Sequence, residues 1–282
     1  MKKNLLNLAW ALVVSIGTGH SVAAFADDAE RPSLLMAVQG SHSIPVLAHT
    51  IQPLVNHLEH ELNATIRWET ASQHSKLVER IKGKRYDLLF VDTPTTLMGH
   101  YQAGYQPFAR IPGVISASFV GFVDGPALIF EDMQGLRVGY LRPMMLATQL
   151  AKRHVIKQGY QPKQFFSEEI YLANHNSALN ALRHGRVDVI SIASAVYGAH
   201  DGVFDDRDLI IIEQTAAVPQ YAFSAHPEMN RKLRNRLKQA LLNAHEKPAA
   251  KEFFERRIVQ KIIPADMRSY APYREMQRYI TD

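Results

Sequence analysis

The chain has 282 residues, of which 46% are hydrophobic and 21% are charged, and its formal net charge is +5. This balance excludes a disordered or fibrous chain, and the length allows one large domain or two modest ones. Because the chain has no cysteine, disulfide bonds, thiol catalysis and cysteine-ligated metal sites are excluded as well.

The first 26 residues have the pattern of an export signal. Two lysines precede the mostly apolar run 5–16, which is too short to span a bilayer, and an A-x-A cleavage site follows at Ala24–Ala26. We therefore expect a cleaved signal peptide over residues 1–26 and a periplasmic mature protein, with an uncleaved membrane anchor as the alternative. Loss of the two lysines would lower the net charge from +5 to +3, which gives no reason to expect nucleic-acid binding.

Strands and helices alternate in the first part of the mature chain. Short apolar runs predict strands, whereas apolar residues spaced three and four apart predict helices. The expected order is strand 33–39, helix 47–62, strand 64–69, a helix from Ser72, strand 87–91 and a helix after Asp92. Asp92 is a typical helix cap, and Pro94 suits the first turn that follows it. This alternation predicts a parallel sheet with right-handed crossovers.

The same alternation returns after residues 111–133, a stretch that contains several glycines and prolines. The elements expected there are strand 136–140, helix 146–157, strand 169–172, helix 177–184, strand 187–193 and strand 209–213, followed by mainly helical chain from Pro227. Basic residues alternate with apolar ones over 231–244, which is typical of a solvent-facing helix.

We expect an α/β fold with two lobes, each a mostly parallel sheet flanked by helices. Lobe one would comprise residues 27–115 and 220–282, and lobe two residues 116–219. The chain would cross between them near 116–124 and return near 215–221.

In open parallel sheets, ligands bind beyond the carboxyl ends of the strands, where helix N-termini also attract anions. Most of the side chains expected there carry hydroxyl groups. They favour a ligand that is small, polar and anionic. The candidates are Ser41, His42, Ser43, Thr93, Thr95 and Thr96 in lobe one, and Tyr140, Arg142, His175 and Ser191 in lobe two.

Each candidate also has a structural interpretation. Serine, threonine and aspartate are ordinary helix caps, Arg142 is equally well a surface arginine, and His175 is equally well a structural residue. Enzyme motifs are absent: the sequence holds no G-x-S-x-G elbow, no P-loop and no H-E-x-x-H. His57 and His60 lie three residues apart but lack a third metal ligand. We therefore expect no enzyme activity, no cofactor and no metal.

Four stretches carry a family resemblance: residues 51–58, 86–96, 132–139 and 174–189. The last is the most specific; it reads NHNSALNALRHGRVDV and is similar to the pattern S-H-x-x-A-L-x-A-L-x-x-G-x-V-D. Through these stretches the chain resembles the periplasmic phosphate/phosphite/phosphonate-binding family of ABC-transporter solute receptors. The resemblance implies the type II periplasmic-binding-protein fold, with a two-strand hinge between two lobes, and a monomer.

The resemblance also assigns site residues. His175 matches the family histidine that contacts the ligand's oxyanion, Thr95 and Thr96 fall in the lobe-one ligand loop, and Ser41–Ser43 occupy the first-loop position. The family's S-T-S-G loop in lobe two is replaced here by YLRPMM over residues 140–145, so Arg142 is a candidate substitute donor. The acidic residues that bind a ligand amine in some members have no counterpart, and Tyr221 stands near one of their positions.

The sequence thus predicts a periplasmic solute-binding protein that captures a phosphonate- or phosphite-like ligand and presents it to an inner-membrane ABC permease. The alternative is a ligand-sensing partner of a membrane histidine kinase or cyclase. An enzyme would need a nucleophile–base pair that the sequence does not provide.

Overall fold

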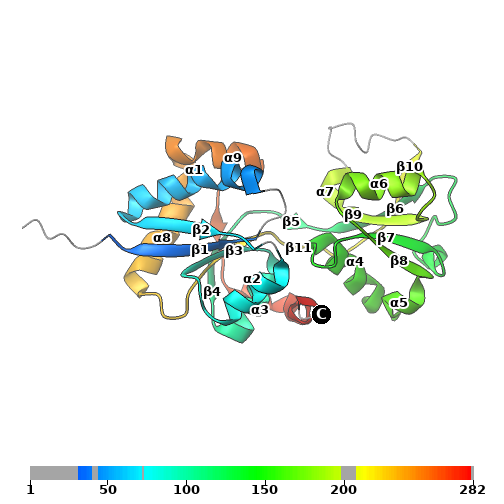
Figure 1. Cartoon of the computed structure of the whole chain (residues 1–282), viewed down its shortest axis with the longest axis horizontal. Helices are drawn as coiled ribbons and strands as arrows, with labels where there is room; N and C mark the ends of the chain where they lie inside the picture. Colours follow the sequence, from blue (N-terminus) through cyan, green and yellow to red (C-terminus); the bar gives the residue numbers. More distant parts are fainter. Residues whose placement is uncertain (1–30, 40–43, 72, 198–207, 281–282) are drawn as a thin grey trace, which may run out of the picture. The chain divides into compact units, whose positions relative to one another are not determined.

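The computed structural model in Figure 1 describes residues 31–39, 44–71, 73–197 and 208–280. The predicted export signal over residues 1–26, the candidates Ser41, His42 and Ser43, and the expected helix start at Ser72 lie outside the described residues. None of the helices in the described ranges has the length and apolar character that a membrane span requires.

The first sheet has six strands in the order β13-β4-β12-β3-β1-β2. Their bounds are β1 (Ser33–Val38), β2 (Thr65–Glu69), β3 (Leu88–Val91), β4 (Gln106–Arg110), β12 (Ala222–Ala225) and β13 (Ile263–Pro264). Strands β2, β1 and β3 pair in parallel, as predicted, whereas β12, β4 and β13 extend the sheet in antiparallel pairing. The sequence did not predict these three strands, because prolines and alanines give them little strand propensity.

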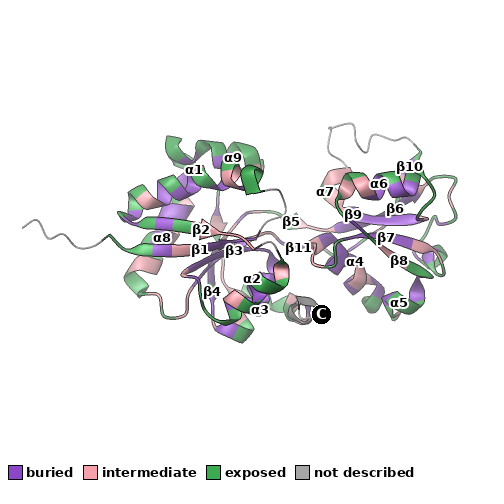
Figure 2. Ribbon diagram, viewed as in Figure 1, coloured by how far each residue is buried: buried purple, intermediate pink, exposed green. Residues whose placement is uncertain are grey.

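Helices cover both faces of the first sheet. They are α1 (Ile44–Leu62), α2 (His74–Lys82), α3 (Thr93–Ala103), α8 (Arg231–Asn243) and α9 (Lys251–Arg257). Phe90 of β3 belongs to the core shared with α1, α8 and α9, whereas its neighbour Leu89 belongs to the core shared with α2 and α3. This alternation explains why β3 reads as a continuous apolar run, and Figure 2 shows the strands buried while the helices keep exposed outer faces.

The second sheet has five strands in the order β10-β6-β9-β7-β8. Its elements are β6 (Ala117–Phe122), β7 (Arg137–Leu141), β8 (Glu168–Leu172), β9 (Val189–Ala193), β10 (Leu209–Gln214), α4 (Leu146–Lys157), α5 (Pro162–Phe165), α6 (His175–Arg183) and α7 (Ser194–Tyr197). Strands β8, β7 and β9 are parallel, and β6 and β10 are antiparallel. Helix α4 has the predicted bounds, but α6 begins at His175 instead of Ser177, because Asn174 caps it.

Two short strands connect the sheets. Strand β5 (Val114–Ile115) follows β4 and pairs in antiparallel fashion with β11 (Val218–Pro219), which precedes β12. This pair corresponds to the two-strand connection that the family resemblance implies. The outward crossing lies before the stretch 116–124 that the sequence indicated, because residues 117–122 already form β6 of the second sheet.

The C-terminal segment packs against helices that serve different sheets. Short 3₁₀ turns are η1 (Glu131–Met133), η2 (Ala244–Glu246), η3 (Pro248–Ala250), η4 (Met267–Ser269) and η5 (Ala271–Ile280). Segment η5 contacts α3 and α4. Buried Arg153 of α4 donates from Nε to Glu275 Oε1 at 2.8 Å and lies over the ring of Tyr273. This ion pair ties the chain end to the second sheet.

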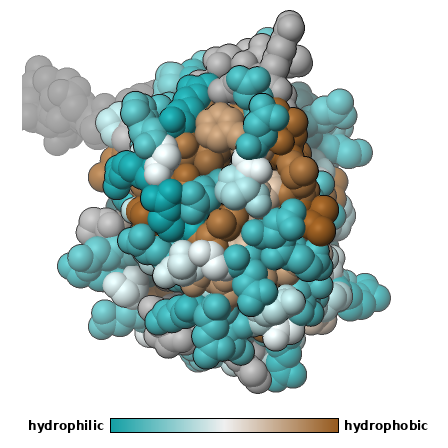
Figure 3. All heavy atoms as spheres, turned by 90° about the vertical axis from the view of Figure 1, so that its right-hand side faces the viewer, coloured by the Kyte–Doolittle hydropathy of each residue, from teal (hydrophilic) through white to brown (hydrophobic). Residues whose placement is uncertain are grey.

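Apolar side chains remain on the surface around the second sheet. Figure 3 shows one face of the molecule, where hydrophobic areas interrupt a mainly hydrophilic surface. Val123, Leu128 and Ile129, all in the loop after β6, are exposed. A few exposed apolar side chains are ordinary on protein surfaces.

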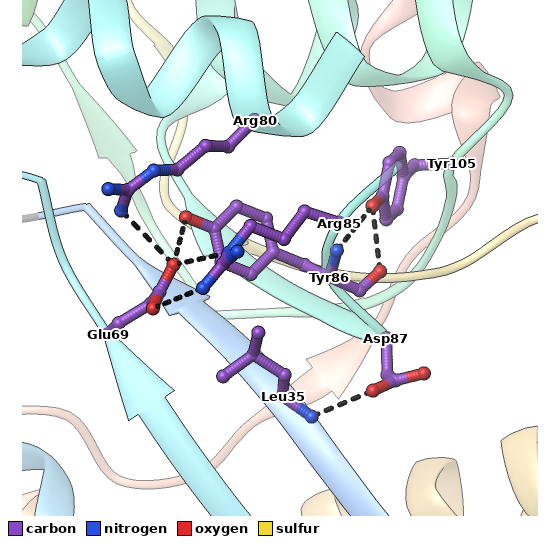
Figure 4. Close-up of polar contacts among 7 residues, drawn as sticks. All are labelled: Leu35, Glu69, Arg80, Arg85, Tyr86, Asp87 and Tyr105. Carbon is purple, nitrogen blue, oxygen red and sulfur yellow. Dashed lines mark hydrogen bonds and ion pairs between the residues drawn. The ribbon is translucent and has the colours of Figure 1, made fainter. Parts of the chain in front are cut away.

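The carboxylate of Glu69, in β2, binds side chains from α2 and from the segment between α2 and β3 (Figure 4). Glu69 accepts hydrogen bonds at Oε1 from Arg80 Nη1 at 3.1 Å, Arg85 Nε at 3.0 Å and Tyr86 OH at 2.8 Å. The backbone of Tyr86 is in turn bonded to the hydroxyl of Tyr105, which donates to Tyr86 O at 2.7 Å. The hydrogen bond from Arg85 is the largest influence on the pKa of Glu69 and holds it below its usual value, although burial opposes it.

We expect the Glu69→Gln variant to lose about 1 kcal/mol of unfolding free energy at pH 7, because the two arginines lose their counter-charge. A carboxyl group whose pKa is lowered by folding stabilises the protein above its unfolded pKa of about 4.3 and loses that effect as pH falls through its folded pKa. The difference between wild type and variant should therefore shrink below about pH 4 in urea unfolding experiments.

The exposed Glu228, whose carboxylate has no partner among the described residues, provides the control. Glu228→Gln should leave stability unchanged at both pH values. An equal difference between wild type and Glu69→Gln at pH 7 and pH 3 would contradict the prediction.

Candidate functional site

The carboxyl ends of β1 and β3 meet the beginning of β12 at one edge of the first sheet. Strand β12 pairs with β3 so that Ala222 lies opposite Val91. Tyr221, the residue before β12, therefore lies at the same edge as Asp92, the residue after β3, and Gln39 follows β1 there. This edge is where the sequence analysis expected a ligand.

Asp92 organises this edge. It is 2% exposed, and its Oδ1 accepts a hydrogen bond from the Thr95 N–H at 3.1 Å, which caps helix α3 as predicted. Its Oδ2 accepts from Gln39 Nε2 at 2.8 Å, and its N–H donates to Gln39 Oε1 at 3.1 Å. The N-terminus of α3 is thus capped by a carboxylate of the protein.

The three candidate threonines follow Asp92 and are all buried. The Thr93 hydroxyl donates to Pro219 O of β11, and the Thr96 hydroxyl donates to Val91 O at 3.3 Å. The Thr95 hydroxyl has no hydrogen-bond partner among the described residues. Only Thr95 therefore has an unused hydroxyl, and it would need a local opening to meet a ligand.

His74 lies beside this network, although the sequence analysis did not single it out. It is the first residue of α2, and its Nε2 is buried without a partner among the described residues. Burial lowers the pKa of His74, and the negative charge of Asp92 opposes that effect. The sequence signal was weak because His74 follows the expected cap Ser72 by two residues and belongs to no motif.

His175 begins helix α6 at the corresponding edge of the second sheet. Asn174 caps the helix: its Oδ1 accepts from Ser177 N at 2.9 Å, while Ser177 Oγ accepts from Asn174 N at 3.0 Å. His175 is partly buried, and its Nδ1 has no partner among the described residues. Burial lowers the pKa of His175 and thereby favours the neutral form of the ring.

The remaining lobe-two candidates differ sharply in exposure. Tyr140 is completely buried beside Phe119 and Phe166, because the alternation of β7 turns it into the core. Ser191 is also completely buried, and its hydroxyl lies 3.5 Å from Ala147 O. Arg142 follows β7, is exposed and makes no ion pair within the described part of the chain. Of these three, Arg142 alone presents its polar group at the surface.

A serine cluster that the sequence analysis did not assemble lies at the end of β9. Ser194 Oγ is 2.9 Å from Ser116 Oγ and 2.8 Å from Ser118 Oγ, and Gln214 Nε2 donates to Ser116 Oγ at 3.0 Å. These residues are far apart in the sequence and meet only because β6 pairs with β9. The cluster supplies neutral donors of the kind that the YLRPMM loop lacks.

A second missed residue is Arg257, the last residue of α9. Its guanidinium carbon lies 5.1 Å from the ring centroids of both Phe90 and Tyr221, which are themselves 5.4 Å apart. Burial lowers the pKa of Arg257. In sequence this arginine looks like an ordinary basic residue of a last helical turn.

A groove of about 810 Å³ lies elsewhere, between α1 and α8. Its lining includes His57, Arg231, Arg236 and Lys247, and it contains none of the candidate ligand residues. His57 contacts Ala240 O through Nε2 at 3.0 Å, which gives this histidine a structural role instead of a metal-binding one.

Comparison with known proteins identifies the family. The sequence model of the family described as "ABC transporter, phosphonate, periplasmic substrate-binding protein" matches residues 38–270. The chain belongs to this family. The resemblance inferred from the four sequence stretches is thereby confirmed, and the sensing alternative is not favoured.

Solved structures show the same fold at low sequence identity. PhnD1 from Prochlorococcus marinus, in complex with methylphosphonate, has a TM-score of 0.73 and 14% identity, over 87% of this chain and 97% of that chain. XAC2383 from Xanthomonas citri, bound to ATP, has a TM-score of 0.74 and 15% identity, over 88% and 96%. A binding protein component of an ABC phosphonate transporter from Pseudomonas aeruginosa has a TM-score of 0.71 and 13% identity, over 89% and 87%.

As a member of the phosphonate-binding family, this protein is an ABC-transporter substrate-binding protein, and membership implies the periplasm. The two strand edges differ in the polar groups they hold. In the first sheet, a carboxylate closes the N-terminus of α3; in the second, the hydroxyls come from β6 and the end of β9.

We expect Asp92→Ala to lower the free energy of unfolding by about 2–3 kcal/mol. The substitution removes a helix cap, which is worth about 1 kcal/mol, and leaves the buried amide of Gln39 without its acceptor, which costs about 1–3 kcal/mol. Urea denaturation measures the loss.

Asn230 is the matched control because its side chain caps exposed α8 and makes no buried contact of this kind. Asn230→Ala should lose only about 1 kcal/mol. Equal losses in the two variants would show that the Gln39 pair adds nothing to the cap.

Proposed function

We propose that this protein captures a small oxyanion of the phosphonate and phosphite class between the strand ends of its two sheets and delivers it to an inner-membrane ABC permease. The observation that carries the proposal is the family match, which extends over residues 38–270. PhnD1, with the same fold, is described in complex with methylphosphonate.

Polar groups with unused hydrogen-bonding capacity support an oxyanion at these edges. In the second sheet they are the exposed Arg142, the His175 ring with its unpartnered Nδ1, and the serine cluster of Ser116, Ser118 and Ser194. The first sheet contributes the hydroxyl of Thr95, which has no partner among the described residues. Tyr221 lies at the same edge, and the candidates Ser41, His42 and Ser43 precede α1 in the chain. Neutral donors with a small number of cations are typical of oxyanion sites.

Four of the candidates would stabilise the site without contacting the ligand, because all of them are buried: Thr93, Thr96, Tyr140 and Ser191. Thr93 and Thr96 already donate hydrogen bonds within the protein. The β5–β11 pair would act as the hinge, and closure would be favoured by ligand contacts that exist only in the closed form. The site would discriminate between ligands by their hydrogen-bond acceptors, since each buried donor left without an acceptor costs about 1–3 kcal/mol.

The same proposal covers the organisation of the chain. A signal peptide over residues 1–26 would direct export, and the mature protein would be a monomer with lobe one formed by 27–115 and 220–282 and lobe two by 116–219. Each of the two larger sheets falls within one of these lobes, which supports the division. The protein would bind its ligand without chemical change and without a cofactor.

A thermal-shift screen tests the proposed ligand class. The full chain is expressed with its own leader and purified from the periplasmic fraction, and the mass of the product reports cleavage after Ala26. Phosphate, phosphite, methylphosphonate, methanesulfonate, acetate and amino acids are the probes. A ligand at 100 times its Kd adds about 2.7 kcal/mol, which raises the Tm by about 5–10 °C in a protein of this size. Stabilisation by amino acids alone would overturn the oxyanion proposal.

We expect Arg142→Ala to weaken binding of the stabilising oxyanion at least tenfold, because a charge-assisted hydrogen bond is lost. The Tm without ligand should stay nearly constant, since Arg142 is exposed and makes no ion pair within the described residues. Isothermal titration calorimetry measures the change in Kd.

Arg186 is also exposed and has no charged partner among the described residues, so Arg186→Ala controls for loss of surface charge. Equal affinities of wild type and Arg142→Ala would remove Arg142 from the site.

A further inference from the structure

Arg257 is a cation that the fold places at the strand edge of the first sheet. Its guanidinium lies over the rings of Phe90 and Tyr221. Phe90 stands two residues before Asp92 in β3, and Tyr221 directly precedes β12. The arginine belongs to α9, more than thirty residues further along the chain, and joins this edge because α9 packs on α1.

Three other arginines with partly buried contacts have carboxylate partners, whereas Arg110 donates to the backbone oxygens of Ile111 and Gly113. Arg137 pairs with Asp188, Arg153 with Glu275 and Arg85 with Glu69. Arg257 has no ion pair and no hydrogen bond to any residue that the structure describes; its contacts are the two aromatic rings. A cation that is largely removed from water and has no counter-ion is costly, and aromatic faces offset only part of that cost.

Asp92, the acidic residue that follows β3 at this edge, does not serve Arg257. Both carboxylate oxygens of Asp92 accept hydrogen bonds, one from Thr95 and one from Gln39. The positive charge of Arg257 is therefore uncompensated within the described protein, at the edge where the ligand of the proposed function would bind.

We propose that Arg257 is the anchor for the anionic group of the ligand and that Tyr221 and Phe90 hold it in position. This inference rests on the proposed function and deepens it. Stacking on the rings occupies the face of the guanidinium and leaves its N–H groups for a planar, two-point contact with a phosphonate, phosphate, sulfonate or carboxylate. The first sheet then supplies a full charge, and the second sheet supplies neutral donors and Arg142.

The same charge predicts selectivity. A ligand that carries an ammonium group near its oxyanion meets like-charge repulsion from Arg257, and no described acid at this edge is free to offset it. The site should therefore prefer methylphosphonate to 2-aminoethylphosphonate.

Calorimetry on the full protein, purified from the periplasm, tests the anchor with methylphosphonate and inorganic phosphate as probes. Arg257→Met keeps the apolar stem for stacking but removes the charge, and it should weaken binding of the better probe at least about 30-fold. The Tm without ligand should remain or rise, because no partner is left unpaired. The neighbouring Arg256, which pairs only with Glu252 on the exposed side of α9, is the control; Arg256→Met should bind as wild type does.

Arg257→Lys provides a second measurement that does not depend on removal of the charge. It should fold as wild type does, bind about tenfold more weakly because an ammonium group cannot make the two-point contact, and keep the discrimination against 2-aminoethylphosphonate. Arg257→Met should lose that discrimination.

If Arg257→Met binds the probe with wild-type affinity, the inference is overturned and the proposed function stays intact. If Arg257→Met does not fold, wild-type affinity of Arg257→Lys has the same consequence. Absence of binding of any oxyanion by the wild-type protein would overturn both.

Discussion

The insertion of β12 between β3 and β4 is the constraint on which the rest of the structure depends. This four-residue strand is completely buried and bonds to both neighbours, so the first sheet is continuous only after the chain has built the second sheet and come back. The return forces two chain passages side by side, which pair as β5 and β11. The connection between the sheets is therefore a consequence of how the first sheet is completed.

The same insertion shapes the edge at which the proposed ligand would bind. Because Ala222 pairs with Val91, Tyr221 lies level with Asp92. The ring of Tyr221 then contacts the guanidinium of Arg257. Asp92 meanwhile fixes the start of α3 and the end of β1 through Gln39. One register thus joins the cap, the aromatic pair and the cation, although they come from distant parts of the chain.

Charge is distributed unequally between the two strand edges. The first sheet holds an internally satisfied carboxylate and the largely buried guanidinium of Arg257, whereas the second holds hydroxyls, a histidine and the exposed Arg142. Such a division suits a ligand with one strongly charged end, because a cation provides attraction and neutral donors provide discrimination.

Local patterns in the sequence determined the parallel cores of both sheets, the bounds of α4, the cap at Asp92 and the family, because each of these depends on residues near one another in the chain. They did not predict β4, β12 and β13, whose prolines and alanines become strands only when neighbours supply the hydrogen bonds. They also placed Tyr140 and Ser191 among ligand residues without showing that both are buried. The Ser116–Ser194 contact and the Arg257 stack were decided by the tertiary structure alone, because pairing of strands across more than seventy residues and packing of α9 on α1 leave no periodicity in the sequence.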